Sequence, residues 1–183
     1  MNGLYIVLGI VGLIIIIIVG IVISISNRFN RYSIKIEEAD SGIDIALTKR
    51  YDVLTKMMEV VKKYTQYEKE TMFEVIKLRK GMTPEEKAEA NNKMSANYDK
   101  IQIMAENYPE LKSSENYKTL QQAIADVEEH LQAARRMYNA NVSAYNQMLV
   151  TFPSSMIANS KHLVKKNFFE TDEVKKQDVK IDL

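Results

Sequence analysis

Residues 4–25 read LYIVLGIVGLIIIIIVGIVISI and carry no charged side chain. At about 1.5 Å per residue, a helix of this length covers the roughly 30 Å hydrocarbon core of a bilayer. Tyr5 and Ser24 depart from the aliphatic character only near the ends of the run, where polar groups are tolerated. The first charged side chain is Arg28. We therefore expect a transmembrane anchor at residues 1–27 with a soluble domain behind it.

A cleaved signal peptide is the alternative interpretation of this run. Such a peptide has a basic start and a shorter apolar stretch of about 7–15 residues. Met1-Asn2-Gly3 has no basic side chain and the run is longer, although Ser24-Ile25-Ser26 weakly resembles a cleavage site. The chain also has no Cys that a lipid anchor would need. The pattern favours an uncleaved membrane helix.

Three basic residues, Arg28, Arg31 and Lys35, follow the run, whereas no basic side chain precedes it. Lys and Arg close to a membrane segment are retained in the cytoplasm. We therefore expect a single-pass protein of the cell membrane that contacts the lipid bilayer through residues 4–25. Its N-terminus would lie outside and its C-terminal domain in the cytoplasm.

The composition of the remaining chain indicates a helical domain without affinity for nucleic acid. The whole sequence has 25 Lys and Arg against 24 Asp and Glu, so it lacks the positive surplus that non-specific nucleic-acid binding needs. Between Arg28 and Thr83 there is no Pro, and Gly occurs only at positions 42 and 81. Residues that favour helix are frequent, and no strand pattern is convincing. The fold class is all-α.

Apolar residues spaced three and four apart predict amphipathic helices. The first covers about residues 29–50, and the second covers 53–80 and ends at Gly81 in a left-handed conformation. The third begins at the capping box Thr83-Pro84-Glu85-Glu86 and ends at Pro109. The fourth is capped by Ser113 or Ser114 and ends at Phe152-Pro153.

The fourth helix carries the most regular apolar stripe, and such sustained spacing is typical of helices packed in a bundle. Its members are Tyr117, Leu120, Ile124, Val127, Leu131, Ala134, Tyr138, Val142, Tyr145 and Leu149. We therefore expect an elongated helical bundle domain at residues 28–153. Residues 154–183 are expected to form a short helix or loop followed by a loose tail.

The fourth stretch also carries a family resemblance. Arg136-Met137-Tyr138-Asn139, Val142, Tyr145-Asn146 and Phe152-Pro153 resemble the R-x-Y-N-x-x-V-x-x-Y-N…F-P signature of the LemA family. Residues 43–52 and 106–112 resemble further motifs of that family, so the resemblance covers nearly the whole chain. It implies a membrane anchor followed by an antiparallel four-helix bundle, but it implies no activity, because none is established for the family.

The resemblance is also the reason to expect a turn or kink at residues 51–55, between the first two helices. LemA-like chains carry Ile-Pro-Asn after the Arg-Tyr-Asp motif, and the Pro marks a break. This chain has Leu54-Thr55-Lys56 instead, so no breaker stands there. A family His in the second helix is replaced by Tyr67, and any role of that His does not carry over.

The sequence is poor in catalytic residues. It has no Cys, and its two His are His130 and His162. No Gly-rich phosphate loop, H-E-x-x-H or G-x-S-x-G motif is present. A di-iron site in a bundle needs Glu-x-x-His, but Val127 stands three residues before His130. We therefore expect no catalytic residue, no cofactor and no metal ligand, with His130 as a surface or boundary residue beside Leu131.

Two features are candidates for interaction. Tyr138-Asn139 and Tyr145-Asn146 repeat seven residues apart and form a candidate recognition strip, although Tyr residues on the other seams favour an internal packing role. Gly20 and Ser24 make one small-xxx-small step, a weak signal for helix association in lipid. The charged residues around Arg50 and Arg135 could pair between helices, but a solvated charged face is the simpler interpretation.

Two functions remain open at the level of sequence. The first is a non-enzymatic, membrane-anchored helical scaffold or adaptor of the bacterial cell envelope, which binds other envelope proteins or further copies of itself. The alternative is a ligand- or metal-binding bundle, or an enzyme, that uses core carboxylates and tyrosines. A buried cluster of Glu, Asp and Arg would favour the alternative, and a dry apolar seam would favour the scaffold.

Overall fold

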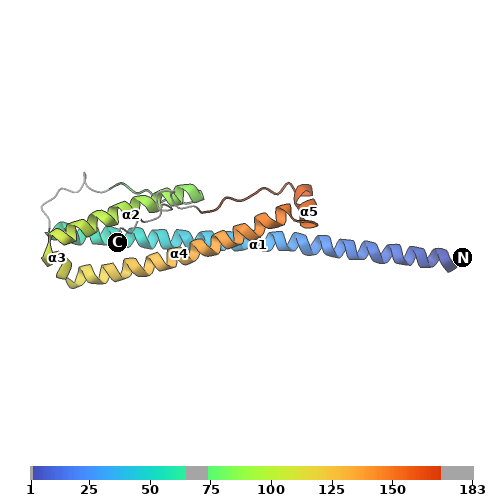
Figure 1. Ribbon diagram of the computed structural model, residues 1–183, viewed down its shortest axis with the longest axis horizontal. Coiled ribbons are helices and arrows are strands. Elements are labelled where there is room, and N and C mark those ends of the chain that lie inside the picture. Colours follow the sequence, from blue (N-terminus) through green and yellow to red (C-terminus); the bar gives the residue numbers. More distant parts are fainter. Residues whose placement is uncertain (1, 65–73, 170–183) are drawn as a thin grey trace, which may run out of the picture. The chain divides into compact units, whose positions relative to one another are not determined.

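The computed structural model describes residues 2–64 and 74–169, and the regular secondary structure of these residues is helical, without a strand (Figure 1). The helices are α1 (Asn2–Tyr64), α2 (Pro84–Asn107), α3 (Pro109–Ser113), α4 (Glu115–Val150) and α5 (Ser154–Ser160). The described residues form two compact units. Unit 1 contains residues 2–38 and 139–167, and unit 2 contains residues 39–64, 74–138 and 168–169.

Helix α1 is continuous through residues 51–55, so the predicted turn or kink there is wrong. This segment has neither Gly nor Pro, and Thr55 Oγ1 donates to the Tyr51 carbonyl oxygen at 2.8 Å within the helix. The buried stripe also continues from Leu47 to Met57. Because no helix-breaking residue is present and the apolar face is unbroken, both helix propensity and core packing favour a single helix.

The second predicted helix, residues 53–80, is correct only as far as Tyr64, where α1 ends. Residues 65–73, which include Tyr67, lie outside the described residues, and residues 74–80 are not helical. Gly81 has the expected left-handed backbone, with φ at 78°, but it belongs to a turn before α2 and does not end a helix.

The start of α2 confirms the capping box. Thr83 Oγ1 accepts a hydrogen bond from the Glu86 N–H at 3.2 Å, and a Glu86 carboxylate oxygen accepts one from the Thr83 N–H at 2.8 Å. Pro84 occupies the first helical position, where its missing N–H leaves no helical bond unmade. Helix α2 ends at Asn107, and Pro109 begins the short helix α3, which the sequence pattern did not predict.

Unit 2 packs parts of α1, α2 and α4 with α3 around one apolar core. Its members include Leu54, Met57, Val61, Met94, Ile101, Leu111, Tyr117 and Ile124. Helix α2 runs parallel to α1, because Lys87 bonds Asp40 while Asn91, one turn later, bonds Arg50. Helix α4 runs antiparallel to α1. The described residues therefore contain three long helices, two of them parallel, in place of the predicted antiparallel four-helix bundle.

A long connection explains how α2 becomes a parallel neighbour of α1. Antiparallel neighbours are joined by short loops, whereas parallel neighbours need a crossover that returns along the bundle. Nineteen residues, 65–83, separate Tyr64 from Pro84 in the chain, and residues 74–83 are the described part of this connection. In its described part, the buried Asn97 side chain donates to the Glu74 carbonyl oxygen at 3.0 Å and accepts from the Glu74 N–H at 2.8 Å. One side chain of α2 thus holds the connecting segment.

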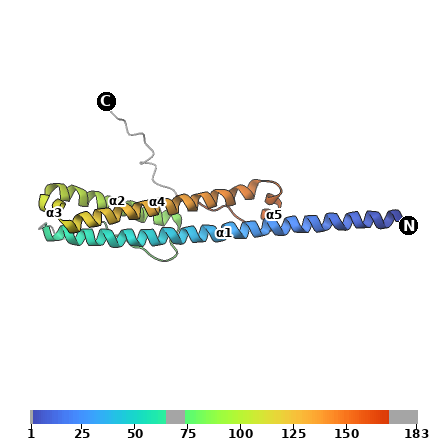
Figure 2. The ribbon, with the colours of Figure 1, turned by 90° about the horizontal axis from the view of Figure 1, so that it is seen from below.

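Unit 1 combines the N-terminal part of α1 with the end of α4 and with α5 (Figures 1 and 2). The rings of Phe29 and Tyr145 meet edge to face, with centroids 5.6 Å apart. Asn141 Nδ2 donates to the Lys35 carbonyl oxygen at 3.3 Å. The two helices are therefore antiparallel here, and each step toward the end of α4 leads toward the beginning of α1.

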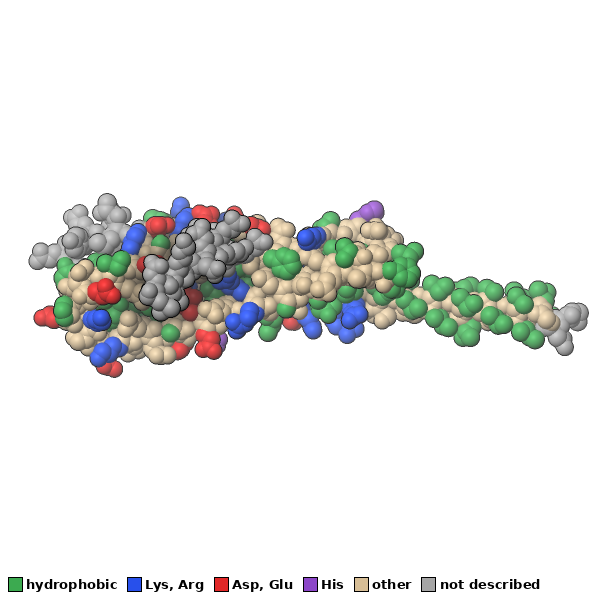
Figure 3. All heavy atoms as spheres, in the orientation of Figure 1, with side chains coloured by type: hydrophobic (Ala, Val, Ile, Leu, Met, Phe, Trp, Pro, Cys, Tyr) green, Lys and Arg blue, Asp and Glu red, His purple; other side chains and the backbone are tan. Residues whose placement is uncertain are grey.

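The apolar run forms the N-terminal part of α1. From residue 3 to residue 24 every residue except Gly12 is exposed. Ile25 and Ser26, which follow, are half-buried. Figure 3 shows hydrophobic side chains along this part of α1 and no charged ones on the visible face. Within the described chain, α1 is the one helix long and apolar enough to cross a membrane.

Candidate functional site

Basic residues follow the exposed apolar run on α1. Arg28, Arg31 and Lys35 are all exposed within the two and a half turns after Ser26. Lys35 Nζ lies 5.9 Å from the centre of the Tyr32 ring, within the range of a cation–π contact. The apolar run, the first half-covered residues and the first positive charges therefore follow one another on one continuous helix.

Unit 2 contains a buried arginine that connects three helices. Arg50 of α1 is 2% exposed. Its Nη1 donates to the Asn91 carbonyl oxygen at 2.9 Å and to Asn91 Oδ1, and its Nη2 donates to Ser95 Oγ at 3.1 Å. The same Nη2 forms an ion pair with the Glu128 carboxylate of α4. We call these four residues the Arg50 cluster.

The electrostatics of the Arg50 cluster are those of a buried charge that is largely compensated. Burial lowers the pKa of Arg50, while the nearby Glu128 carboxylate opposes that effect. Three of the four residues supply hydrogen-bond acceptors, yet Arg50 Nε–H donates to none of the described residues. The expectation that Arg50 belongs to a solvated face is therefore wrong, because the residue fills a position on the buried stripe of α1.

A second buried cation lies one turn before Asn91 on α2. Lys87 is 1% exposed, and its Nζ forms ion pairs with Asp40 Oδ1 at 2.6 Å and Asp44 Oδ1 at 2.7 Å. The carboxylates extend from α1 toward solvent, so these two ion pairs join α1 to α2 at the edge of their interface.

Burial raises the pKa of the nearby Tyr138 hydroxyl, and the Asp40 and Glu85 carboxylates add to that increase.

The four residues of the candidate recognition strip are all placed by the structure. Tyr138 and Tyr145 are buried, in units 2 and 1 respectively. Asn139 is half-buried. Asn146 donates through Nδ2 to the Lys166 carbonyl oxygen and accepts from the Lys166 N–H through Oδ1, each at 2.9 Å. The buried rings and the Asn146 bonds are internal contacts and need no partner to account for them.

Asn146 therefore holds the segment after α5 in the way that Asn97 holds the segment before α2. In both cases one side-chain amide bonds the N–H and the C=O of a single residue in a non-helical segment. Further along in unit 2, Phe169 is buried, and the guanidinium carbon of Arg135 lies 4.7 Å from the centre of its ring. We call Asn97 and Asn146 the two clamp residues.

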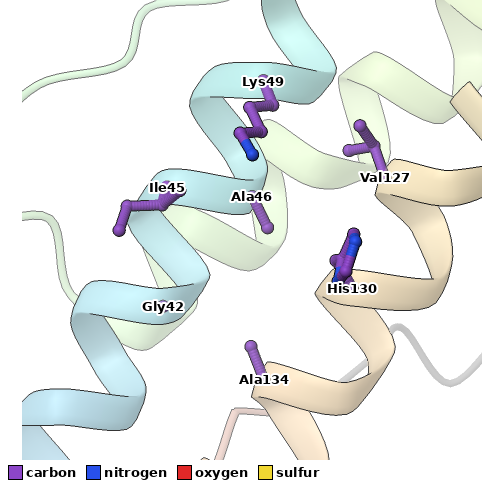
Figure 4. A pocket seen from close by; sticks show the side chains of 7 residues that line it. All are labelled: Gly42, Ile45, Ala46, Lys49, Val127, His130 and Ala134. Atoms are coloured by element: carbon purple, nitrogen blue, oxygen red, sulfur yellow. The ribbon is translucent and has the colours of Figure 1, made fainter. Parts of the chain in front are cut away.

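A shallow groove of about 250 Å3 lies between α1 and α4 in unit 2 (Figure 4). Ala46 and Ala134 point toward the opposite helix across it, and Lys49 and His130 line it as well. His130 is exposed, as expected from the sequence. The volume is below the roughly 300–1,000 Å3 of pockets that enclose a small molecule.

Among the described residues, no group of three His, Cys, Asp or Glu side chains is arranged to hold a metal ion. The notable polar positions are instead Arg50, Lys87, Asn91 and Asn97, which are all buried. They have a sequence signal, because they continue the three-and-four spacing of the apolar stripes. Arg50 lies three residues after Leu47, and Asn91 and Asn97 lie three residues on either side of Met94.

Comparison with known proteins gives two consistent findings. Residues 39–183 match the model of the LemA family. The chain is also similar to Protein LemA of Metamycoplasma hominis, with 26% identity over 158 residues. That alignment covers 84% of this chain and 72% of the relative. The family match includes the Arg50 cluster, both clamp residues and the candidate recognition strip, and it begins after the apolar run.

Proposed function

We propose that this chain, which belongs to the LemA family, is a membrane-anchored helical scaffold of the cell envelope that does not turn over a substrate. The observation that carries the proposal is helix α1, which continues from an exposed apolar run into the packed core of the domain. The N-terminus lies outside the cell membrane and the domain lies in the cytoplasm. Its partners are envelope proteins or further copies of the chain.

Two properties of α1 support the anchor and its orientation. A continuous run of exposed Ile, Val and Leu side chains is unfavourable in water, because each buried aliphatic side chain gains about 1.5–3 kcal/mol on leaving it. Insertion into a bilayer removes these side chains from water without any packing against other parts of the chain. Arg28, Arg31 and Lys35 then follow the run on the side that carries the domain, which is the cytoplasmic arrangement of basic residues.

The interior of unit 2 supports a binding role over a catalytic one. Its buried side chains are chiefly apolar and include Ile43, Leu47, Met94, Ile101 and Leu131. The groove between α1 and α4 is smaller than a small-molecule site and is lined chiefly by aliphatic side chains. The clamp residue of unit 2, Asn97, uses both the oxygen and the nitrogen of its amide to bond backbone groups of this chain.

The Arg50 cluster favours the second candidate function, an enzyme or ligand-binding bundle. It brings together a buried Arg and a half-buried carboxylate from facing helices, which is part of the buried Glu, Asp and Arg cluster that this alternative needs. One donor, Nε–H, has no acceptor among the described residues. A ligand that uses this cluster would have to enter between α1, α2 and α4, since each of these helices supplies part of it.

In vivo photo-crosslinking separates the two functions. A photoreactive side chain replaces the exposed Ile103 or Met137 in intact cells, with the buried Ile124 as the matched control position. The scaffold predicts discrete protein adducts at an exposed position and none at Ile124. It also predicts that Glu128→Gln leaves these adducts unchanged in the protein that remains folded, because an exposed surface and not the Arg50 cluster binds the partner.

The contrary result is equally specific. If neither exposed position forms adducts, while Glu128→Gln abolishes the cellular phenotype of the protein and leaves its abundance and melting temperature unchanged, the enzyme or ligand-binding alternative holds. A conservative change at one half-buried carboxylate would then remove activity without removing the fold.

A further inference from the structure

The turn between α4 and α5 exposes large apolar side chains in unit 1. Val150, Phe152 and Met156 are 79%, 81% and 64% exposed. The turn itself is firmly held, because Ser154 and Ala158 of α5 are buried and Ser154 Oγ donates to the Thr151 carbonyl oxygen at 2.8 Å. The fold therefore keeps three apolar side chains in solvent at one end of a helix.

The position of this turn along α1 is set by the antiparallel contacts. Tyr145 lies against Phe29, and each residue beyond it leads about 1.5 Å nearer to the apolar run. Val150 therefore lies about 7 Å beyond that contact, level with Ser24 to Ser26. The exposure of α1 agrees, because Ile25 and Ser26 are half-covered and residues 13–24 are exposed. Figures 1 and 2 both show α5 beside α1 in this region.

The charges of unit 1 are segregated. In its described residues the carboxylates are Glu37 and Glu38, both more than two turns beyond Arg28 along α1. Its basic side chains are Arg28, Arg31, Lys35, Lys161, Lys165 and Lys166. Lys161 and Lys165, which follow α5, are exposed. The whole chain is nearly neutral at +1, so positive charge is concentrated around the apolar turn.

We propose that the α4–α5 turn is a second membrane contact, which inserts Phe152 and its apolar neighbours into the surface of an anionic bilayer. This inference rests on the proposed membrane anchor. Apolar side chains at an interface enter the headgroup–acyl boundary to about 5–10 Å, while flanking Lys and Arg bind anionic headgroups. The turn lies level with the end of the apolar run and carries basic side chains beside it, which is the arrangement that this contact requires.

The contact gives the protein two points of attachment to one membrane. A single helix leaves the domain free to rotate about the helix axis, whereas a second contact selects the face of unit 1 that meets the bilayer. Unit 1 is thereby held in one orientation relative to the lipid. The anionic lipid would stabilise that orientation, and high ionic strength would weaken it.

Depth-dependent quenching of tryptophan fluorescence tests this proposal on the full chain. The protein has no Trp, so variants with a single introduced tryptophan report on one position each. Phe152→Trp probes the turn, Ile16→Trp probes the anchor, and Ile103→Trp is the control at an apolar position in unit 2 that is 60% exposed. Each variant is reconstituted in phosphatidylcholine vesicles with or without phosphatidylglycerol, with lipids brominated at shallow or deep positions.

The proposal predicts a different result for each variant. In Phe152→Trp, the emission shifts to shorter wavelength and is quenched several-fold more by shallow than by deep bromine, chiefly when phosphatidylglycerol is present. The emission of Ile16→Trp is quenched by deep bromine in both lipid mixtures, and that of Ile103→Trp is quenched in neither. Lys161→Gln combined with Lys165→Gln reduces the quenching of the tryptophan at position 152 without changing that at position 16.

Three outcomes overturn the inference, and they distinguish its failure from failure of the anchor. If Phe152→Trp behaves like Ile103→Trp while Ile16→Trp is quenched, the anchor stands and the second contact is absent. If the blue shift of Phe152→Trp disappears when the chains are diluted with excess lipid, a second copy covers the turn instead of the bilayer. If Ile16→Trp is also unquenched, the proposed membrane anchor itself is wrong, and the second contact falls with it.

Discussion

At the scale of single residues, the most informative positions are polar side chains on apolar stripes. Arg50 and Lys87 are buried, and each forms an ion pair with a carboxylate of another helix. The removal of each cation from water is unfavourable, so such a pair adds little net stability compared with apolar residues of the same volume, although its carboxylate is only half-buried. Loss of a carboxylate would nevertheless be destabilising, because the buried cation is then left without its ion pair. We infer that these residues define which helices pair and in which register.

Substitution of Arg50 measures this effect. Arg50→Ala should lower the free energy of unfolding by about 3 kcal/mol, because Glu128 and the Asn91 carbonyl lose their partner and a cavity remains. The matched control is Arg136→Ala at an exposed position of α4, which should stay within about 0.5 kcal/mol of the wild type. Urea unfolding of the detergent-solubilised chain, followed by circular dichroism, measures both. Equal stability of the two variants would contradict the assigned cluster.

Tyr138 makes stability depend on alkaline pH. Its pKa is raised chiefly by burial, with the Asp40 and Glu85 carboxylates adding to the effect, so the folded chain holds the phenol proton more tightly than the unfolded chain. The associated stability is present below the ordinary tyrosine pKa of about 10 and is lost as the pH rises above it. Between about pH 9 and pH 11, Tyr138→Phe should therefore lose less unfolding free energy than the wild type. If the unfolding free energy of both proteins declined equally with pH, Tyr138 would not be the source of the alkaline dependence.

At the scale of helices, the caps and the buried faces could be predicted from the sequence, but the relative direction of neighbouring helices could not. The capping box at Thr83 and the stripe of α4 depend on short-range spacing, and both are confirmed. Periodicity shows which face of a helix is buried, but not whether its neighbour is parallel. The expected break at residues 51–55 followed the family pattern, whereas the chain lacks the Pro that causes a break.

The clamp residues were also beyond sequence analysis, because their partners are backbone groups of segments distant in sequence. Asn97 bonds Glu74, and Asn146 bonds Lys166. Neither a motif nor a periodicity indicates such a contact. The signal that remains is an Asn on the inward-facing side of an amphipathic helix, where an apolar residue is the usual choice.

Proteolysis tests the two clamps against each other. Asn97→Leu should release the segment that contains Lys77, Arg79 and Lys80, because two backbone hydrogen bonds disappear with the amide. Asn146→Leu should release the segment at Lys161 to Lys166 instead. Limited trypsin digestion with mass spectrometry of the first cuts should show each variant cleaved faster at its own segment. Faster cleavage of both segments in either variant would indicate general unfolding rather than loss of a clamp.

At the scale of the whole molecule, the family, the helical class and the long apolar helix follow from the sequence, and all three are supported by the structure and the comparisons. The candidate site was harder to predict from the sequence. The repeat of Tyr138 and Tyr145 made them a candidate recognition strip, whereas their place on the apolar stripe favoured internal packing, and their burial agrees with the packing role. The groups that these side chains contact, such as the Phe29 ring against Tyr145, depend on neighbours in space, which a single sequence does not specify.

The central claim is that α1 crosses the membrane and holds the rest of the chain in the cytoplasm. The chain has no Cys, so single-cysteine variants can be labelled cleanly with a membrane-impermeant maleimide. We predict that Gly3→Cys is labelled in intact cells, whereas Arg136→Cys, at an exposed site of α4, is labelled only after permeabilisation. Labelling of Arg136→Cys in intact cells, with Gly3→Cys protected until permeabilisation, would contradict the account.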